Sequence, residues 1–439
     1  MRSSLYTFFN IELLVAILFV SSYSVASKSH GNKKNISKET KESKEVDICN
    51  IENRYTPIIC YCTTVINGNI DVQNATKINA SCLILEKLEH SNSIWNYFTS
   101  QPYLEQLMFT VRSNDSFDYV PSQMLRQLNN LRVVKFRYAK LDELAERAFS
   151  NLVSIQEISL KRNTIVVLHK YAFENMKNLA AIDLDENRIS EINRDTFVNL
   201  PILRSLHLNR NNISNVHDRA FKYLNSLREL ELSDNQIVVV KRDSFHGLSN
   251  LLRLDLSNNL ISTIDERSFV EMPELVELKL DQNQIKYISG RALDGMRNLR
   301  KLLLSENQLM TLTSDFLVGA PGVNFLDLRN NNLKTMTFDN IKPIIFNLYS
   351  TDSQFYLNDN RLICDCKLAW IWGLQHETKS TKLKDALKEL ICILDINESQ
   401  KINNENFEKS QQRKITQNFS KFCFAYKETC IKQRFLLSM

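Results

Sequence analysis

Four cysteines early in the chain have a spacing that suits disulfide chemistry. Cys49, Cys60, Cys62 and Cys82 follow the order C-x10-C-x-C-x19-C. Such thiols form disulfides in an oxidising compartment, or bind zinc as thiolates where they stay reduced. The chain opens with a candidate secretory signal, so we expect disulfides rather than a zinc site. Four cysteines allow three pairings, and their spacing alone does not choose among them.

A second group of cysteines lies toward the other end. One residue separates Cys364 from Cys366, Cys392 follows, and Cys423 and Cys430 come last. The chain contains nine cysteines in all. Because nine is an odd number, we expect one thiol to stay outside the intramolecular pairs. That thiol could form a bridge to another molecule.

Seven asparagines occupy N-x-S/T sequons, which accept N-linked glycans in secreted proteins. The predicted glycosylation sites are Asn35, Asn74, Asn79, Asn114, Asn212, Asn397 and Asn418. Asn212 lies inside a regular repeat and is expected to point outward, so a glycan there would keep partners away from that rim. The alternative is that these sequons carry no glycan.

The sequence offers little for catalysis. Its seven histidines show no metal-binding spacing and no nearby nucleophile motif, and no glycine-rich phosphate loop occurs. We therefore expect a protein that is not an enzyme and that uses no cofactor and no metal ion. Its activity should depend on binding between surfaces.

Between Leu131 and Gly322, a 24-residue pattern repeats eight times without insertion or deletion. It reads L-x-x-L-x-L-x-x-N-x-L-x-x-L, and two more large apolar residues follow. One copy contains Leu203, Leu206, Leu208, Asn211, Ile213, Val216, Phe221 and Leu224. This is the leucine-rich repeat pattern, in which each repeat forms one coil. We predict an α/β fold: a right-handed, curved solenoid with a parallel sheet on its concave face and a disulfide-tied cap at each end.

The alternation within each repeat separates an inner from an outer face. Leu206 and Leu208 point to one side of a short strand, and His207 points to the other. A recurring asparagine can satisfy turn groups of its own and the adjacent coil, and a recurring phenylalanine packs the far side. These columns are Asn163, Asn187, Asn211, Asn235, Asn259, Asn283, Asn307 and Asn331, and Phe149, Phe173, Phe197, Phe221, Phe245 and Phe269, continued by Leu293 and Leu317. Function is therefore expected at variable strand positions, loops or caps.

The same patterns divide the chain into segments. Residues 1–26 are predicted to be a secretory signal, because Arg2 precedes an apolar run and Ser24-Val25-Ala26 fits a cleavage site. The other predicted segments are a polar, disordered leader (27–46), the N-terminal cysteine-rich cap (47–103), about 10–11 coils (104–362), the C-terminal cysteine-rich cap (363–396) and a basic, disordered tail (397–439).

The end of the chain bears on where the protein acts. No stretch after residue 27 is long and apolar enough for a transmembrane helix, and no clear glycolipid-anchor signal occurs. We therefore expect a protein that is secreted or lies on the extracellular face of the cell surface. The basic tail could bind acidic matrix polymers or a membrane surface, and the alternative is a solvated end. Nucleic acid is not an expected partner of a secreted chain.

The segment from Asn360 to Trp370 reads N-R-L-I-C-D-C-K-L-A-W. It resembles the C-terminal cysteine-rich flank of extracellular leucine-rich repeat proteins. With the cap motif that begins at Cys49, the chain resembles arthropod adhesion proteins of this class over roughly residues 49–396. The resemblance implies a surface glycoprotein that mediates homophilic adhesion between cells and that is held by a glycolipid anchor. It also implies the disulfides Cys49–Cys62, Cys60–Cys82 and Cys364–Cys392, with Cys366 bonded to Cys423 or Cys430.

Two functions follow from these observations. The first is cell adhesion or recognition, in which the concave face binds a protein partner, with a second copy of the chain as a candidate. The alternative is a soluble matrix component or ligand-trapping protein that binds an unlike partner. The predicted partner-binding residues are Lys135, Arg137, Tyr138, Lys161, Arg162, Asp183, Asp185, Glu186, Glu231, Asp255, Leu303 and Phe325. Basic early coils and acidic middle coils would align two copies head to tail.

Overall fold

A computed structural model gives the structure of the chain. It describes residues 48–50, 56–64, 78–112, 117–393 and 412–414. The chain divides into two compact units, Met1–Glu45 and Val46–Met439, and all described residues belong to the second unit. The predicted secretory signal and leader lie outside the described residues.

One long sheet runs through the second unit. Its strands, in spatial order, are β1 (Ile58–Thr64), β2 (Ile78–Ile84), β3 (Leu104–Val111), β4 (Val133–Arg137), β7 (Glu157–Ser159), β10 (Ala181–Asp183), β13 (Ser205–His207), β15 (Glu229–Glu231), β16 (Arg253–Asp255), β18 (Glu277–Lys279), β20 (Lys301–Leu303), β21 (Phe325–Asp327) and β22 (Gln354–Tyr356). β1 and β2 are antiparallel, and the later neighbours are parallel. Leu206 lies opposite Leu230, so the register follows the sequence repeat.

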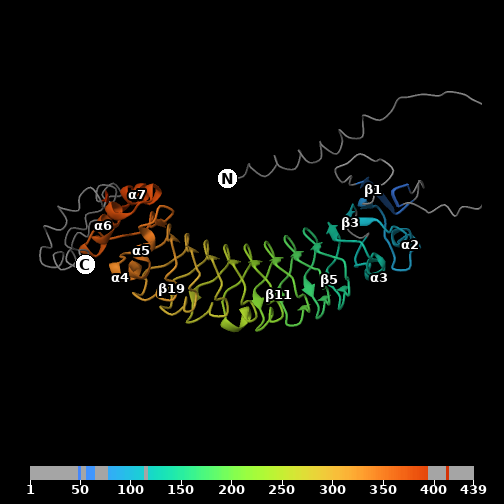
Figure 1. The fold of residues 1–439 in the computed structure, drawn as a ribbon, viewed down its shortest axis with the longest axis horizontal. Helices are drawn as coiled ribbons and strands as arrows, with labels where there is room; N and C mark the ends of the chain where they lie inside the picture. The colour runs from blue at the N-terminus through green and yellow to red at the C-terminus, as the bar shows by residue number, and fades with distance from the viewer. Residues whose placement is uncertain (1–47, 51–55, 65–77, 113–116, 394–411, 415–439) are drawn as a thin grey trace, which may run out of the picture. The chain divides into compact units, whose positions relative to one another are not determined.

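Shorter parallel pairings connect the return paths of the coils. They join β5 (Glu143–Leu144) to β8 (Val167–Leu168), β6 (Phe149–Ser150) to β9 (Phe173–Glu174) and β12 (Phe197–Val198), β11 (Glu191–Ile192) to β14 (Asn215–Val216), and β17 (Thr263–Ile264) to β19 (Tyr287–Ile288). The 3-10 helix η2 (Arg242–Phe245) lies on the return path of another coil. Figure 1 shows the coils side by side along an arc, with the long sheet on the concave side. The predicted fold class is confirmed.

The leucine and phenylalanine columns form one continuous core. Leu206 and Leu208 are fully buried, as is Phe221. Adjacent members of the phenylalanine column stack, with a centroid distance of 5.4 Å between Phe149 and Phe173. Since every coil buries its apolar row against the next one, the core extends along the solenoid and leaves the outer strand positions to the solvent.

The asparagine column satisfies buried backbone groups of two coils, as its spacing predicted. The side-chain amide of Asn211 donates to the carbonyl oxygens of Leu184 and Leu208, at 3.0 and 3.1 Å. Its side-chain oxygen accepts a hydrogen bond from the backbone N–H of Ile189 at 3.0 Å. The residue before each ladder asparagine adopts a left-handed conformation, with φ of 54° at Arg210. This sharp turn directs the asparagine inward.

The N-terminal end of the sheet is tied by two disulfides. Cys49 of η1 (Ile48–Asn50) is bonded to Cys62, and Cys60 is bonded to Cys82 across the β1–β2 pair. These are the pairs that the resemblance implied. In the chain, helix α2 (Trp95–Thr99) comes before β3 and helix α3 (Ser122–Gln127) comes after it. Trp95 packs there against an aromatic cluster that contains Phe98, Phe109 and Phe117.

The last coil is longer than the others because it contains helices. They are α4 (Phe338–Ile341), η3 (Lys342–Ile344) and α5 (Ile345–Leu348), and β22 follows. Beyond β22 come η4 (Cys366–Leu368), α6 (Trp370–Glu377), α7 (Thr381–Lys388) and β23 (Ile391–Ile393). The indole N–H of Trp370 donates to the carbonyl oxygen of Met336 at 2.8 Å, which fixes α6 to the lengthened coil.

The C-terminal cap contains the disulfide Cys364–Cys392 that the resemblance implied. Strand β24 (Gln412–Lys414), within the predicted tail, pairs antiparallel with β23, the strand that contains Cys392. The resemblance also implied a disulfide from Cys366 to Cys423 or Cys430. The side chain of Cys366 and both possible partners lie outside the described part of the structure, so this disulfide stays a prediction.

Candidate protein-binding face

The outer side chains of the long sheet, from β4 to β22, form a surface that we call the sheet face. Seven of the predicted partner-binding residues lie on its strands, namely Lys135, Arg137, Asp183, Glu231, Asp255, Leu303 and Phe325. Lys161 and Asp185 each lie two residues after a strand ends. Tyr138, Arg162 and Glu186 have φ values between 54° and 61° and lie in the turns at the rim. The prediction therefore mixes two locations, the sheet face and its rim.

Basic side chains of the early coils form ion pairs with acidic side chains of neighbouring coils. Lys135 lies 2.7 Å from Glu157, on the neighbouring strand. Lys161 contacts both Asp185, at 3.4 Å, and Glu186, at 3.3 Å. Burial opposes the charge of Lys161, but the hydrogen bond to Glu186 and the nearby acids hold its pKa above the usual value. The basic side chains are therefore largely paired with the acidic side chains of the next coils.

The same pairing continues through the middle coils. Arg253 contacts Glu229 at 2.9 Å, and Lys279 contacts Asp255 at 2.9 Å. The hydrogen bond from Arg253 is the largest influence on Glu229 and lowers the pKa of that carboxyl. Each pair joins two strands that are adjacent in the sheet, because the repeat places every side chain beside its counterpart in the next coil.

The last coils of the sheet face carry apolar and aromatic side chains instead. Leu303, Phe325 and Tyr356 are half-buried, and the rings of Phe325 and Tyr356 lie 5.9 Å apart. The guanidinium of Arg329 lies 4.8 Å from the centre of the Tyr356 ring and contacts Asp327 at 2.5 Å. Tyr356, Asp327 and Arg329 also lie on the face, although they are not among the predicted partner-binding residues. The repeat register indicated Asp327 and Arg329, and the predicted last strand, with Phe355 and Leu357 pointing inward, indicated Tyr356 between them.

One carboxylate of this region has no basic partner among the described residues. The side chain of Asp281 accepts a hydrogen bond from the Ser305 hydroxyl at 3.3 Å. Burial, followed by the charges of Asp327 and Asp255, raises the pKa of Asp281 to about 6. Asp281 is not among the predicted partner-binding residues, because a repeat pattern does not show burial or the pairing of neighbouring side chains.

The predicted glycosylation sites differ in their surroundings. Asn212 is exposed, as expected for the residue that follows a ladder asparagine. Asn79 is half-buried in β2, and its side-chain oxygen has no hydrogen-bond partner in the part of the chain that the structure describes. The other predicted sites, Asn35, Asn74, Asn114, Asn397 and Asn418, lie outside the described residues. Glycosylation stays a prediction at all seven positions.

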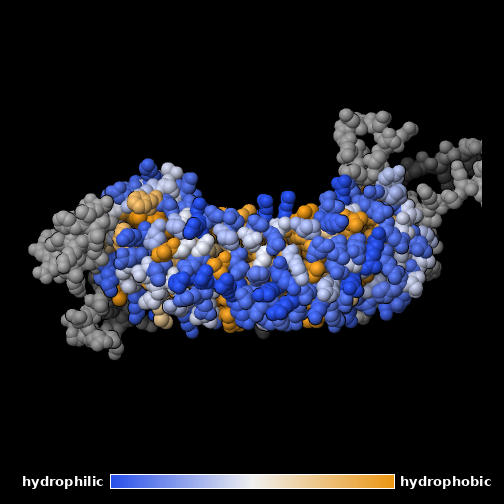
Figure 2. Space-filling view, turned by 60° about the horizontal axis from the view of Figure 1, so that its bottom comes forward, coloured by the Kyte–Doolittle hydropathy of each residue, from blue (hydrophilic) through white to orange (hydrophobic). Residues whose placement is uncertain are grey.

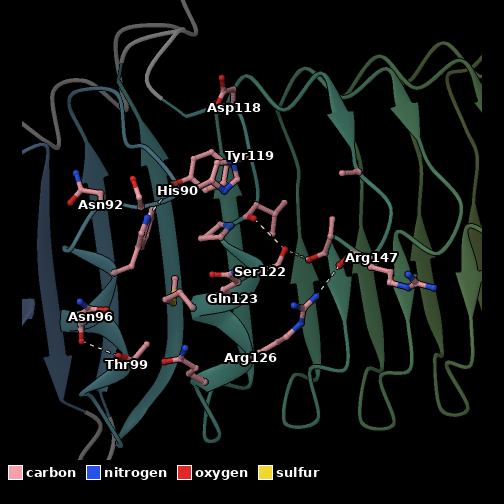
Figure 3. Close-up of a pocket in the computed structure, with 18 of the residues that line it drawn as sticks. His90, Asn92, Asn96, Thr99, Asp118, Tyr119, Ser122, Gln123, Arg126 and Arg147 are labelled. Carbon is pink, nitrogen blue, oxygen red and sulfur yellow. Dashed lines mark hydrogen bonds between the residues drawn. The ribbon is translucent and has the colours of Figure 1, made fainter.

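A cavity of about 610 Å³ lies between α2 and α3, close to the N-terminal end of the sheet (Figure 3). The indole N–H of Trp95 donates to the Tyr119 hydroxyl at 3.1 Å, and His90 stacks on the Tyr119 ring at 3.6 Å. Burial raises the pKa of Tyr119 to about 12, so its hydroxyl stays neutral. Arg126 donates to the carbonyl oxygen of Ser150 at 3.2 Å and so links α3 to the coils. These contacts join the cap region to the first coils.

Apolar side chains are also exposed away from the sheet face. Figure 2 shows hydrophobic residues in separate groups on a mainly hydrophilic surface. Phe346 of α5 is 83% exposed, and Met310, on the coil that contains β20, is 57% exposed. No group of three or more potential ligands in the described ranges could hold a metal ion. None of the helices that the structure describes is long and apolar enough to cross a membrane.

Comparison with known proteins identifies the repeats. Residues 154–333 match the leucine-rich repeat family in overlapping windows, which are 154–213, 177–237, 201–261, 226–285, 250–309 and 273–333. The chain is 36% identical over 119 residues to connectin of Drosophila melanogaster. This match covers 27% of the chain but only 17% of connectin.

Solved leucine-rich repeat structures are similar at lower identity. A chain of the Drosophila Toll–Spatzle complex matches with a TM-score of 0.48 and 22% identity, covering 70% of this chain and 44% of that one. A chain of the complex of latrophilin 3, Unc5D and FLRT2 matches with a TM-score of 0.43 and 23% identity, covering 56% of this chain and 81% of that one. Residues 154–333 thus belong to the leucine-rich repeat family, and the chain, which has a disulfide-bonded cap at each end, is similar to connectin over 119 residues.

Proposed function

We propose that this chain is an extracellular recognition protein that binds a protein partner on its sheet face. The similarity to connectin and the disulfide-bonded caps support an extracellular adhesion or binding role. The sheet face carries the proposal, because it presents rows of variable side chains on a rigid scaffold while the other columns build the core. Leu303 and Phe325 supply apolar contacts on that face.

Homophilic adhesion is the specific form of this activity that the resemblance implies. A head-to-tail pair was expected to lay basic early coils over acidic middle coils. The structure weakens that premise, since Lys135 and Lys161 already contact acidic side chains of the same chain. Opening those pairs would cost part of what new pairs contribute. We therefore favour an unlike partner on the sheet face, which suits both recognition at a cell surface and the alternative of a soluble ligand-trapping protein.

The test displays the full chain on cells that otherwise lack it. Aggregation of the displaying cells with one another would indicate homophily, whereas adhesion only to cells of other lines would indicate an unlike partner. The double variant Leu303→Arg and Phe325→Arg places two charges on the sheet face and should abolish either form of adhesion. Met310→Arg, on the same coil but off the long sheet, is the matched control and should keep adhesion. Equal adhesion by both variants would refute the sheet face as the binding surface.

A further inference from the structure

The last coils of the sheet face combine an acid that lacks a basic partner with apolar side chains. We define the C-terminal patch as Asp281, Leu303, Phe325 and Tyr356, which lie on or directly after strands β18, β20, β21 and β22. These strands are consecutive in the long sheet, Asp281 lies two residues after Lys279, which is opposite Leu303, and the rings of Phe325 and Tyr356 are in contact.

The charges around Asp281 are already matched. On one side, Lys279 contacts Asp255 at 2.9 Å. On the other side, Arg329 contacts Asp327 and covers the Tyr356 ring. Asp281 itself accepts a hydrogen bond from the Ser305 hydroxyl. Its negative charge is therefore the one on this patch that a positive group from outside could neutralise without displacing an existing partner.

We propose that the C-terminal patch receives a lysine or arginine side chain of the protein partner beside an apolar residue of that partner. This inference rests on the proposed binding role of the sheet face and adds the chemistry that selects the partner. The cation would contact the Asp281 carboxylate, and the apolar residue would cover Leu303 and Phe325 at the edge of the Tyr356 ring, whose face Arg329 covers. Basic and aromatic side chains in desolvated surroundings are common anchors of protein interfaces.

We expect that Asp281 can be changed to asparagine without disturbing the fold. Asn209 and Asn358 occupy the corresponding position in other coils, so the fold accommodates an amide there. Burial raises the pKa of Asp281, which means that its charge does not favour folding. Asp281→Asn should therefore melt at the same or a higher temperature than the natural chain at neutral pH. A loss of binding in this variant could not be attributed to unfolding.

The experiment selects binders from a phage-displayed library of random peptides on the immobilised full chain with its disulfides intact. We expect the selected peptides to contain a lysine or arginine next to an apolar residue. They should bind Asp281→Asn at least roughly tenfold more weakly. Asp294→Asn makes the same change in charge on the same coil but off the long sheet, and should bind them as the natural chain does. Peptides without basic residues, or equal binding by both variants, would overturn the proposal.

Binding should also depend on pH through Asp281. The charged groups that interact with its carboxyl are Asp255, Asp327 and Arg329, and Lys279, on the strand that Asp281 follows, is paired with Asp255. As the pH falls below about 6 the carboxyl becomes neutral, so affinity for the basic peptides should fall. Asp281→Asn should lack this dependence, and an unchanged dependence in that variant would count against the proposal.

The outcomes separate this inference from the proposed function. If the Leu303→Arg and Phe325→Arg variant loses adhesion but selected peptides bind Asp281→Asn normally, the sheet face is the binding surface and the role of Asp281 is wrong. If neither adhesion nor peptide binding responds to the double variant, both proposals are wrong.

Discussion

The first and last parts of the sheet face share one scaffold but differ in the exposure and pairing of their charged side chains. From β4 to β16, ion pairs such as Lys135–Glu157 and Arg253–Glu229 lie between partly exposed side chains. From β18 to β22, Asp327 is 2% exposed and tightly paired, while Asp281 is half-buried, accepts a hydrogen bond from Ser305 and has no ion-pair partner among the described residues. The first part also has a buried carboxylate, Asp185, but Lys161 pairs with it, whereas Asp281 of the last part has no basic partner among the described residues.

The largest expected effect comes from breaking the pair between the half-exposed Arg329 and the buried Asp327 in the last part. Arg329→Ala would leave the buried Asp327 carboxylate without its cation and would also remove the contact with Tyr356. We expect a loss of roughly 3 kcal/mol in the free energy of unfolding, because an unpaired buried charge is strongly destabilising. Chemical denaturation monitored by circular dichroism would measure it.

Arg253→Ala is the matched control for that measurement. Its partner Glu229 keeps access to solvent, so the expected loss is at most about 1 kcal/mol. If the two arginine variants lose the same stability, burial does not distinguish the two parts of the sheet face.

A smaller effect of opposite sign is expected at Asp281. Its folded pKa of about 6 lies above the ordinary value of 3.8, so folding favours the neutral form. That contribution is complete below about pH 4 and is lost as the pH rises through about 6. Asp281→Asn, which is neutral at every pH, should therefore stabilise the chain at pH 7 by on the order of 2 kcal/mol.

The pH dependence gives this prediction its control. Near pH 4 the variant and the natural chain should have almost equal stability, because both carry a neutral group at position 281. Denaturation curves at several pH values would show the difference growing with pH. A constant difference would mean that the amide acts through packing and not through the charge.

The smallest effect is expected in the charged ladder of the first part. A double-mutant cycle of Lys135→Ala and Glu157→Ala should give a coupling energy below about 1 kcal/mol, since both side chains are partly exposed. Raising the salt concentration should reduce it further. A coupling energy as large as the Arg329 effect would remove the contrast between the two parts.

The sequence was sufficient to predict the scaffold. An uninterrupted 24-residue period places Leu206 beside Leu230 and Asn211 one coil before Asn235, so the parallel sheet, its core and the asparagine ladder follow from spacing alone. The grouping of Cys49, Cys60, Cys62 and Cys82 likewise indicated a tied end, although the pairing itself came from resemblance. Such patterns are readable because each is set by local geometry that repeats in every coil.

Only the tertiary structure decided how the sheet face uses its charges. In the sequence, Lys161 and Asp281 are simply charged residues at variable positions. Packing of the coils brings Lys161 to its acidic neighbours and leaves Asp281 desolvated beside Ser305. The helices of the lengthened coil bring Tyr356 opposite Asp327, at a sequence distance that the repeat does not predict. Pairing and desolvation depend on which side chains share a surface in space, and the order of residues along the chain does not contain that information by itself.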